Sequence, residues 1–175
     1  MTAVFARVWG IGGVVLLLAQ AIVRLAPRAL EAVRSELDVV QWVALVLWCA
    51  FMAHAEGLRG FHRRFSPRVV ARAWALAAAP TPLRVALAPM FCMSLFAASR
   101  RGRIVAWSIV LGVAVLVAIV SRFEQPWRGI VDAGVVLGLG IGAASIVLHT
   151  VRAMGGTPPP IDPDLPVALG SDRAQ

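Results

Sequence analysis

The residue best placed to do chemistry is Asp132, which lies one turn inside the last apolar run, Gly129 to His149. An ionisable group inside a membrane span is unfavourable, and it usually faces the protein interior or a water-filled cavity. Asp132 is therefore a candidate for an ion or proton path. The alternative is a carboxylate in the first helical turn, where it favours the helix dipole and pairs with Arg128 or Arg122. Its place close to the end of the run favours this second interpretation.

Two histidines, His54 and His149, lie near the ends of apolar runs and are candidate ligands of a haem or a metal. They fall on the same side of a membrane only if the segment between residues 82 and 99 does not cross it. Single histidines at helix ends are commonly interfacial, which is the competing interpretation. His62 stands among arginines, so we expect it to be solvated.

The motifs of familiar enzymes are missing. The chain has no Lys, which excludes a Walker P-loop, a Schiff base and a Ser-Lys nucleophile, and it has no HExxH, GxSxG or CxxC motif. Cys49 and Cys92 both lie in apolar stretches, where a free cysteine behaves as a small hydrophobic residue. We therefore expect a non-enzymatic protein without metal or cofactor.

The elements that carry these residues are apolar helices. Hydrophobic residues make up 59% of the 175-residue chain and the mean hydropathy is +0.80, above the range of soluble domains. We predict an all-α integral membrane protein with one domain over residues 1–152 and a disordered Pro/Gly-rich tail over 153–175. Runs of about 20 apolar residues predict four spans, at about 6–26, 37–57, 104–121 and 129–150.

The first apolar run has two interpretations. Ala19-Gln20-Ala21 is a small-x-small pattern typical of a signal-peptide cleavage site, so residues 1–21 could be a cleaved signal. The run continues through Val23 in helix-compatible sequence, which favours an uncleaved first span. Pro27 is expected to end or kink this helix, and residues 29–38 have the spacing of a short amphipathic segment at the membrane surface.

A fifth hydrophobic segment, 82–99, is short and is broken by Pro89. It either crosses the membrane or folds back as a re-entrant hairpin. Hydropathy favours crossing. Charge favours folding back, because Arg100, Arg101 and Arg103 then join the other arginines on the cytoplasmic side. The sequence leaves both alternatives open.

The most basic stretch lies between the second and fifth segments. Ser66-Pro67 is a helix-start pattern, and it predicts an amphipathic helix in the headgroup layer that favours anionic lipid. Simple positive-inside topology is the alternative explanation. The net charge of +8 belongs to such loops and not to a nucleic-acid site. The candidate headgroup contacts are Arg59, Arg63, Arg64, Arg68 and Arg72.

Gly134, Gly138 and Gly142 recur every four residues in the last span and therefore line one stripe of a helix. Small residues allow close helix approach in a membrane. We expect this helix, 129–150, to be the one around which the others pack and to mediate a homo- or hetero-oligomer. The leading functional hypothesis is an accessory or scaffold subunit; the alternatives are a channel or transporter that uses Asp132, and a haem or metal protein.

The expected location is a bacterial inner membrane with the N-terminus in the cytoplasm. Lys, Asn and Tyr are all missing, and all three use A/T-rich codons, which suggests a GC-rich bacterial genome. The arginine-rich loops predict which side faces the cytoplasm.

Overall fold

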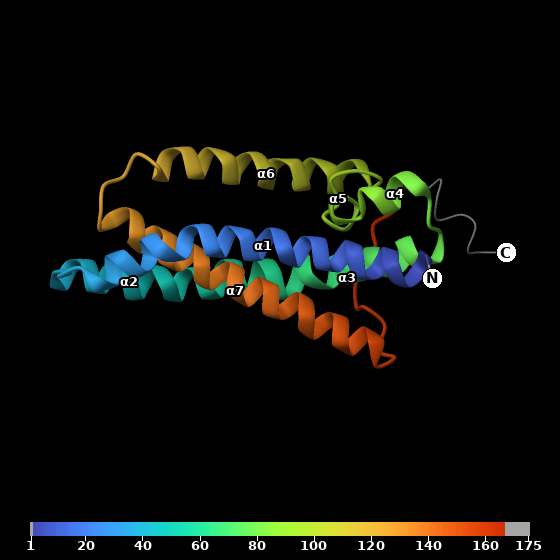
Figure 1. Cartoon of the computed structure of the whole chain (residues 1–175), viewed down its shortest axis with the longest axis horizontal. Helices are drawn as coiled ribbons and strands as arrows, with labels where there is room; N and C mark the ends of the chain where they lie inside the picture. The colour runs from blue at the N-terminus through green and yellow to red at the C-terminus, as the bar shows by residue number, and fades with distance from the viewer. Residues whose placement is uncertain (1, 167–175) are drawn as a thin grey trace.

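A computed structural model describes residues 2–166, and these residues form helices and connecting loops without a strand. Figure 1 shows their order along the chain. The helical segments are α1 (Thr2–Arg34), α2 (Val39–Met52), η1 (Ala53–Phe65), α3 (Ser66–Ala78), α4 (Pro82–Ala86), α5 (Ala88–Cys92), α6 (Arg100–Val120) and α7 (Trp127–Met154).

Four helices are long and apolar enough to cross a membrane, which confirms the prediction of an all-helical chain with four such elements. They are Thr2–Arg34, Val39–Ala78, Arg100–Val120 and Trp127–Met154. The second is a single continuous helix made of α2, η1 and α3, which we call helix 39–78. It starts at a capping box: the Asp38 carboxylate accepts from the Gln41 N–H at 2.7 Å, and the Gln41 side chain accepts from the Asp38 N–H at 3.1 Å.

The predicted break between a second span and a separate surface helix at Ser66 is wrong, because helix 39–78 runs through it. Its middle part, η1, is a π-helix with i→i+5 hydrogen bonds, and the Ser66 N–H donates to the Phe61 carbonyl in this pattern. Pro67 therefore lies inside an existing helix, where it removes one hydrogen bond. α1 likewise continues through Pro27 to Arg34, so no separate amphipathic segment covers residues 29–38.

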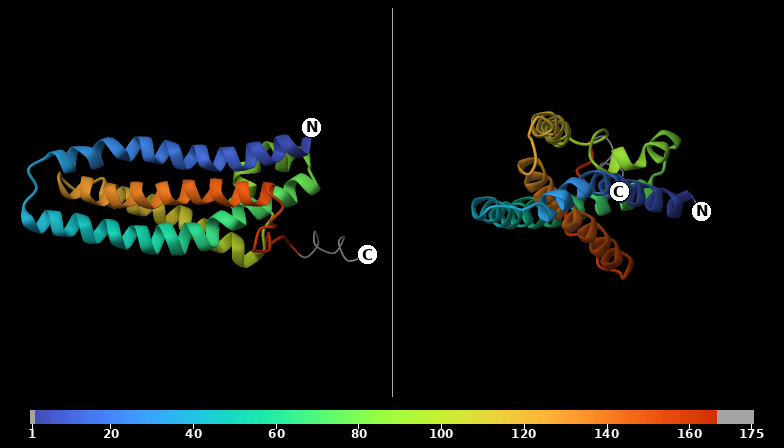
Figure 2. Two further views of the ribbon diagram at one scale, coloured as in Figure 1. Left: turned by 90° about the horizontal axis from the view of Figure 1, so that it is seen from below. Right: turned by 60° about the vertical axis from the view of Figure 1, so that its left-hand side comes forward.

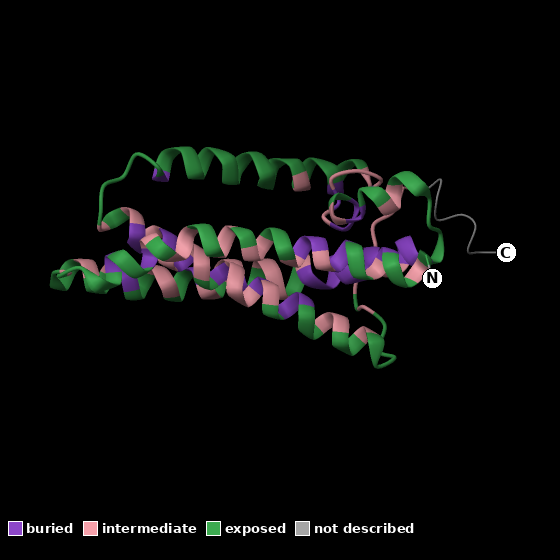
Figure 3. Ribbon diagram, in the orientation of Figure 1, coloured by how far each residue is buried: buried purple, intermediate pink, exposed green. Residues whose placement is uncertain are grey.

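Three helices form a bundle, and the fourth lies beside it. α7 contacts α1, α2, η1 and α3, and it runs parallel to helix 39–78 and antiparallel to α1 (Figure 2). α6 stands apart from this bundle in both figures. Figure 3 shows α6 as exposed along nearly its whole length. One of the four long apolar helices, α6, therefore lies outside the bundle.

Residues 82–99 form two five-residue helices and an irregular stretch instead of a long helix. Five residues rise only about 7.5 Å, which is too short to cross a bilayer. α5 packs on α1, with Pro89 against Gly13 and the Cys92 sulfur against Gly10. The chain enters α6 at the same end of the bundle where helix 39–78 finishes (Figure 1).

The start of the tail is part of the fold. α7 ends at Met154, and Asp164 and Leu165 are half-buried, with Leu165 packed against the core cluster formed by α1, α3, α5 and α7. The sequence predicts a disordered tail over 153–175, whereas residues 163–165 contact the helices in the structure. The last part of that predicted tail, 167–175, lies outside the described residues.

Candidate functional site

The contact between helix 39–78 and α7 brings several polar side chains together. In η1 and just after it, residues five apart face α7, because a π-turn closed by an i→i+5 hydrogen bond is wider than an α-turn. Glu56 lies against Gly138, and Phe61 lies against Gly142. The Ser66 hydroxyl donates to the Gly142 carbonyl at 3.5 Å. We call this contact the seam.

The three striped glycines of α7 all face helix 39–78 and are buried. Gly134 touches Trp48, and a Cβ placed on Gly138 would lie 3.2 Å from the Glu56 carboxylate. A Cβ on Gly142 would lie 2.7 Å from the Phe61 ring. Small residues here allow the two helices to approach closely. The stripe is therefore covered by the chain's own helix, which leaves no room there for a second chain.

The histidine pair in the structure is His62 with His149. Their ring centroids are 5.1 Å apart, and the His62 Nδ1 lies 3.1 Å from the Ser145 hydroxyl. The His149 Nε2–H donates to the His62 carbonyl at 3.1 Å. His54, which the sequence suggested as the partner of His149, is exposed on the outer face of η1.

The described residues contain no group of three or more His, Cys, Asp or Glu side chains placed to hold a metal ion. Structural zinc sites use four protein ligands and catalytic ones use three. Two imidazoles whose nitrogens already bond to Ser145 and a carbonyl therefore fit a packing role better than a haem or metal site. His62 was expected to be solvated, yet it is half-buried in the seam. The signal that points to it is its place five residues after Gly57, which also faces α7.

Asp132 is 4% exposed, and its Oδ2 atom is buried without a hydrogen-bond partner among the described residues. The predicted partner Arg128 instead donates to the Ser121 carbonyl at 3.5 Å. A buried polar atom without a partner is rare and calls for a proton, a water molecule or an ion. Asp132 therefore remains a candidate for proton or cation binding.

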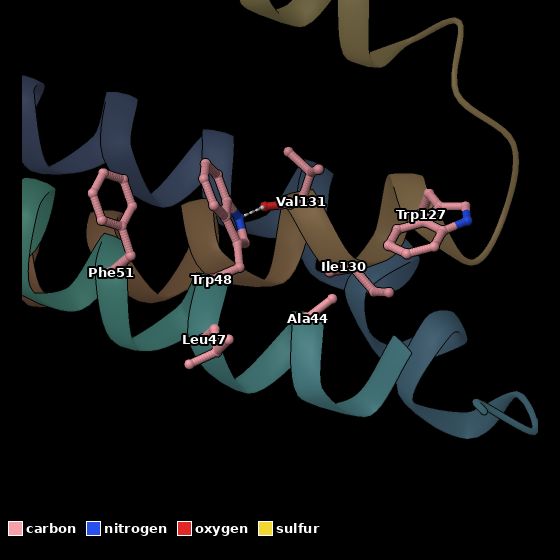
Figure 4. A pocket seen from close by; sticks show the side chains of 7 residues that line it. All are labelled: Ala44, Leu47, Trp48, Phe51, Trp127, Ile130 and Val131. Carbon is pink, nitrogen blue, oxygen red and sulfur yellow. Dashed lines mark hydrogen bonds between the residues drawn. The ribbon is translucent and has the colours of Figure 1, made fainter. Parts of the chain in front are cut away.

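An apolar groove of about 500 Å³ lies between α2 and the first turns of α7 (Figure 4), and Asp132 is not among the residues that line it. The Trp48 indole N–H donates to the Val131 carbonyl at 3.1 Å across its floor. Phe51, Trp127 and Ile130 also line it. This open, apolar lining suits hydrocarbon and offers no catalytic group.

The five candidate headgroup arginines differ in their surroundings. Arg59, Arg63 and Arg64 are exposed and Arg68 is half-buried. Arg72 is completely buried, so the expected lipid contact is wrong for this residue. The reason is that Arg72 lies on the side of α3 that faces α5 and the tail, a neighbourhood that residue spacing alone does not reveal.

Arg72 binds backbone carbonyls from three separate segments. Its Nε–H donates to Phe91 at 2.6 Å, and its Nη groups donate to four further carbonyls at 2.8 to 3.3 Å. The guanidinium also lies 4.3 Å from the centroid of the Phe91 ring. Arg72 thus joins α3 to α5, to the loop before α6 and to the tail. The four further carbonyls belong to Phe96, Ala97, Pro163 and Asp164.

The same stretch of tail also reaches the start of α6. The Ser99 hydroxyl donates to the Asp164 carboxylate at 3.1 Å, and it also accepts from the Gly102 N–H at 3.0 Å as the N-cap of α6. A carboxylate at a helix N-terminus is favoured by the helix dipole. Arg72 and Asp164 therefore fasten the first turn of α6 to the bundle.

The depth of the exposed arginines follows from their neighbours on α7. Between Asp132 and Arg152, the 19 residues 133–151 contain no Asp, Glu, Lys or Arg, and their midpoint is Gly142. Arg59 lies between Gly57, which touches Ile141, and Phe61, which touches Gly142. Within about 9 Å of Gly142 along the helix axis, α7 exposes aliphatic side chains on both sides of that level. One layer of the molecule thus exposes both arginine and hydrocarbon. The exposed aliphatic residues are Leu137, Val147 and Leu148.

Comparison with protein families, curated proteins and solved structures finds no match to this chain.

Proposed function

We propose that this chain is a non-enzymatic accessory subunit of a larger membrane complex, in which another chain covers its exposed arginines. The observation that supports the proposal is the position of Arg59, which is exposed at the level of Gly142, the midpoint of the charge-free stretch of α7. An arginine in the hydrocarbon core is unfavourable by about 2.5–3.5 kcal/mol or more. Such residues usually face a protein interior or a water-filled cavity.

The position of α7 in a bilayer is constrained by its own composition. Its 19-residue charge-free stretch is about 28 Å long, close to the thickness of a bilayer core. Shifting the chain to bring Arg59 to the surface would move exposed Leu148 and Val151 into water. Arg59 lies about 14 Å from the end of the stretch, whereas snorkelling serves residues near helix ends. If another chain covers Arg59, the arginine is shielded from hydrocarbon while the charge-free stretch of α7 stays inside the bilayer.

The sequence predicts that the glycine stripe mediates an oligomer, and the proposal gives it a different role. It is used inside the chain to hold helix 39–78 against α7. The association surface is then the outer, basic face of η1. The oligomer that we propose is a complex with a different protein, held by charge and apolar packing together.

The topology that accompanies the proposal places the N-terminus, both ends of the 79–99 segment and the tail on the cytoplasmic side of a bacterial inner membrane. Segment 82–99 is then a re-entrant hairpin against Gly10 and Gly13 of α1. The positive-inside rule supports this orientation, because the end of the bundle with this hairpin collects most of the arginines near helix ends. These arginines are Arg68, Arg72, Arg84, Arg100, Arg101, Arg103 and Arg152, with Arg7 in α1.

The test is the mass of the particle extracted from its native membrane in mild detergent, by native mass spectrometry. We expect a foreign subunit in fixed stoichiometry with the wild-type chain, and a bare chain for the double variant Arg59→Leu/Arg63→Leu. Arg34→Leu, at the exposed end of α1, is the matched control and should keep the subunit. A bare monomer of the wild-type chain would contradict the proposal.

A second candidate function is an ion or proton path through Asp132, favoured by its buried and unpartnered Oδ2 atom. Asp132→Asn should then abolish flux in reconstituted vesicles, while Glu124→Gln, an exposed acid in the preceding turn, should leave flux unchanged. Equal flux in both variants and the wild type would assign Asp132 a structural role.

A further inference from the structure

The exposed ionisable groups of η1 are all basic, and Leu58 is the one other exposed residue of this helix. His54, Arg59, Arg63 and Arg64 are exposed there, and spacings of five and four residues place them along one side of the π-helix. The one acid of η1, Glu56, is half-buried and turned toward Gly138 of α7. We call this exposed side the arginine face. It has no acid of its own to balance its charge.

We propose that the arginine face binds a transmembrane helix of another protein that carries a carboxylate near the middle of the membrane. This inference rests on the proposed function and adds the chemistry of the partner. Charged groups inside membranes pair with one another, and a pair formed there removes both from hydrocarbon. The required group is an acid at the level of Arg59.

A second copy of this chain does not supply that acid. In a dimer whose copies share one membrane orientation, equal levels meet, so Arg59 would face arginines. Among the described residues, four exposed acids lie in or beside the two turns that join α1 to α2 and α6 to α7, at the opposite end of the bundle: Glu31, Glu36, Asp38 and Glu124. The fifth exposed acid, Asp162, lies in the tail that follows α7 and not at the level of Arg59. Like charges at one level disfavour association through this face.

A lipid phosphate does not reach the whole face either. Headgroups lie outside the hydrocarbon core, whereas Arg59 lies at the level of the Gly142 midpoint. Arg63 and Arg64, which are nearer the hairpin end, are closer to the headgroup layer. Lipid headgroups can therefore contact Arg63 and Arg64, whereas Arg59 stays without a lipid phosphate.

The surface beside the arginine face indicates what the rest of the partner is like. Towards its start, helix 39–78 exposes Val43, Val46, Leu47 and Phe51, each more than half exposed. A partner helix lying along residues 43–64 would therefore contact apolar side chains near residue 43 and arginines near residue 64. The matching partner is apolar along its length with one acid set into it.

The probe for this surface is a synthetic transmembrane peptide of Leu and Ala with a single Glu at its centre, and its matched control peptide has Gln there. Each is mixed with the full chain in neutral-lipid vesicles at pH 8, and association is measured by energy transfer. We expect the Glu peptide to bind roughly tenfold more tightly than the Gln peptide.

The variants decide between charge and packing. Arg59→Leu should remove the preference for Glu, Arg59→Lys should retain it, and Arg122→Leu, exposed in the turn at the opposite end, should not change it. Equal binding of both peptides to the wild-type chain would overturn the inference, as would a preference that survives Arg59→Leu. A preference for Glu that appears only in vesicles containing anionic lipid would also overturn it, because lipid would then be the ligand.

This experiment separates the two proposals. If the native particle holds a foreign subunit that depends on Arg59, while the Glu peptide shows no preference, the accessory role stands and the carboxylate partner is rejected. If the native chain is a bare monomer, the accessory role itself fails.

Discussion

The Phe61 ring lies against Gly142, so close that a Cβ on the glycine would be 2.7 Å from the ring. This contact joins a π-helix with a five-residue repeat to an α-helix with a four-residue glycine repeat. Wider π-turns place Glu56, Phe61 and Ser66 on one side, and the glycines make room for them. The contact also sets the depth of Arg59 and therefore underlies both proposals.

Gly142→Leu should separate helix 39–78 from α7. The new side chain would overlap the Phe61 ring, and overpacking of this kind destabilises by about 1–3 kcal/mol or more. Gly140→Leu is the matched control, because nothing lies within 4 Å of a Cβ placed on Gly140. The unfolding midpoint in detergent measures both, and equal midpoints for the two variants would contradict the packing described for the seam.

Arg72→Met should loosen the junction of α5, the tail and α6. The substitution keeps much of the apolar volume but leaves buried carbonyls without a donor, and each unsatisfied group costs about 1–3 kcal/mol. Arg101→Met, an exposed arginine of α6, should leave the unfolding midpoint unchanged. If Arg72→Met were as stable as the control, the five hydrogen bonds would be energetically neutral.

Asp132→Asn tests whether the buried carboxylate destabilises the folded state. Its Oδ2 atom has no partner among the described residues. Replacing the carboxylate by a neutral amide should therefore leave the free energy of unfolding unchanged or raise it by about 1 kcal/mol, which would raise the unfolding midpoint. Glu124→Gln, which is exposed, should have no effect. A marked loss of stability in Asp132→Asn would reveal that the carboxylate holds a bound cation or ion pair.

Cys92 should be unreactive in the folded chain. Burial raises the pKa of its thiol to about 12, against the opposing influence of the Arg72 charge, so almost no thiolate exists at pH 8. In a Cys49→Ala background, a maleimide should label the chain only after unfolding. Above pH 9 the unfolded thiol ionises while the folded one does not, so this residue's contribution to stability falls as the pH rises. Rapid labelling of the folded chain would show that α5 opens readily.

The predictions that hold are those that depend on local sequence. The lengths of the apolar runs predict four long helices, because a span needs about 20 apolar residues in succession. The break at Ser66-Pro67 fails because a π-helical turn already carries the chain into α3. The pairing of His54 with His149 fails because the i→i+5 geometry turns His62 toward α7 and His54 away from it.

The sequence by itself determines the class of this protein: apolar length requires membrane-compatible helices, and the spacing of Gly134, Gly138 and Gly142 places them on one side of α7 by helix geometry alone. Only the tertiary structure decides which helix lies against that side, why Arg72 is buried while Arg59 is exposed, and that segment 82–99 folds into two short helices. The physical reason is that these features depend on contacts between residues up to 92 positions apart, such as Arg72 and Asp164. Hydropathy and periodicity describe each helix separately, whereas burial is a property of the helices together.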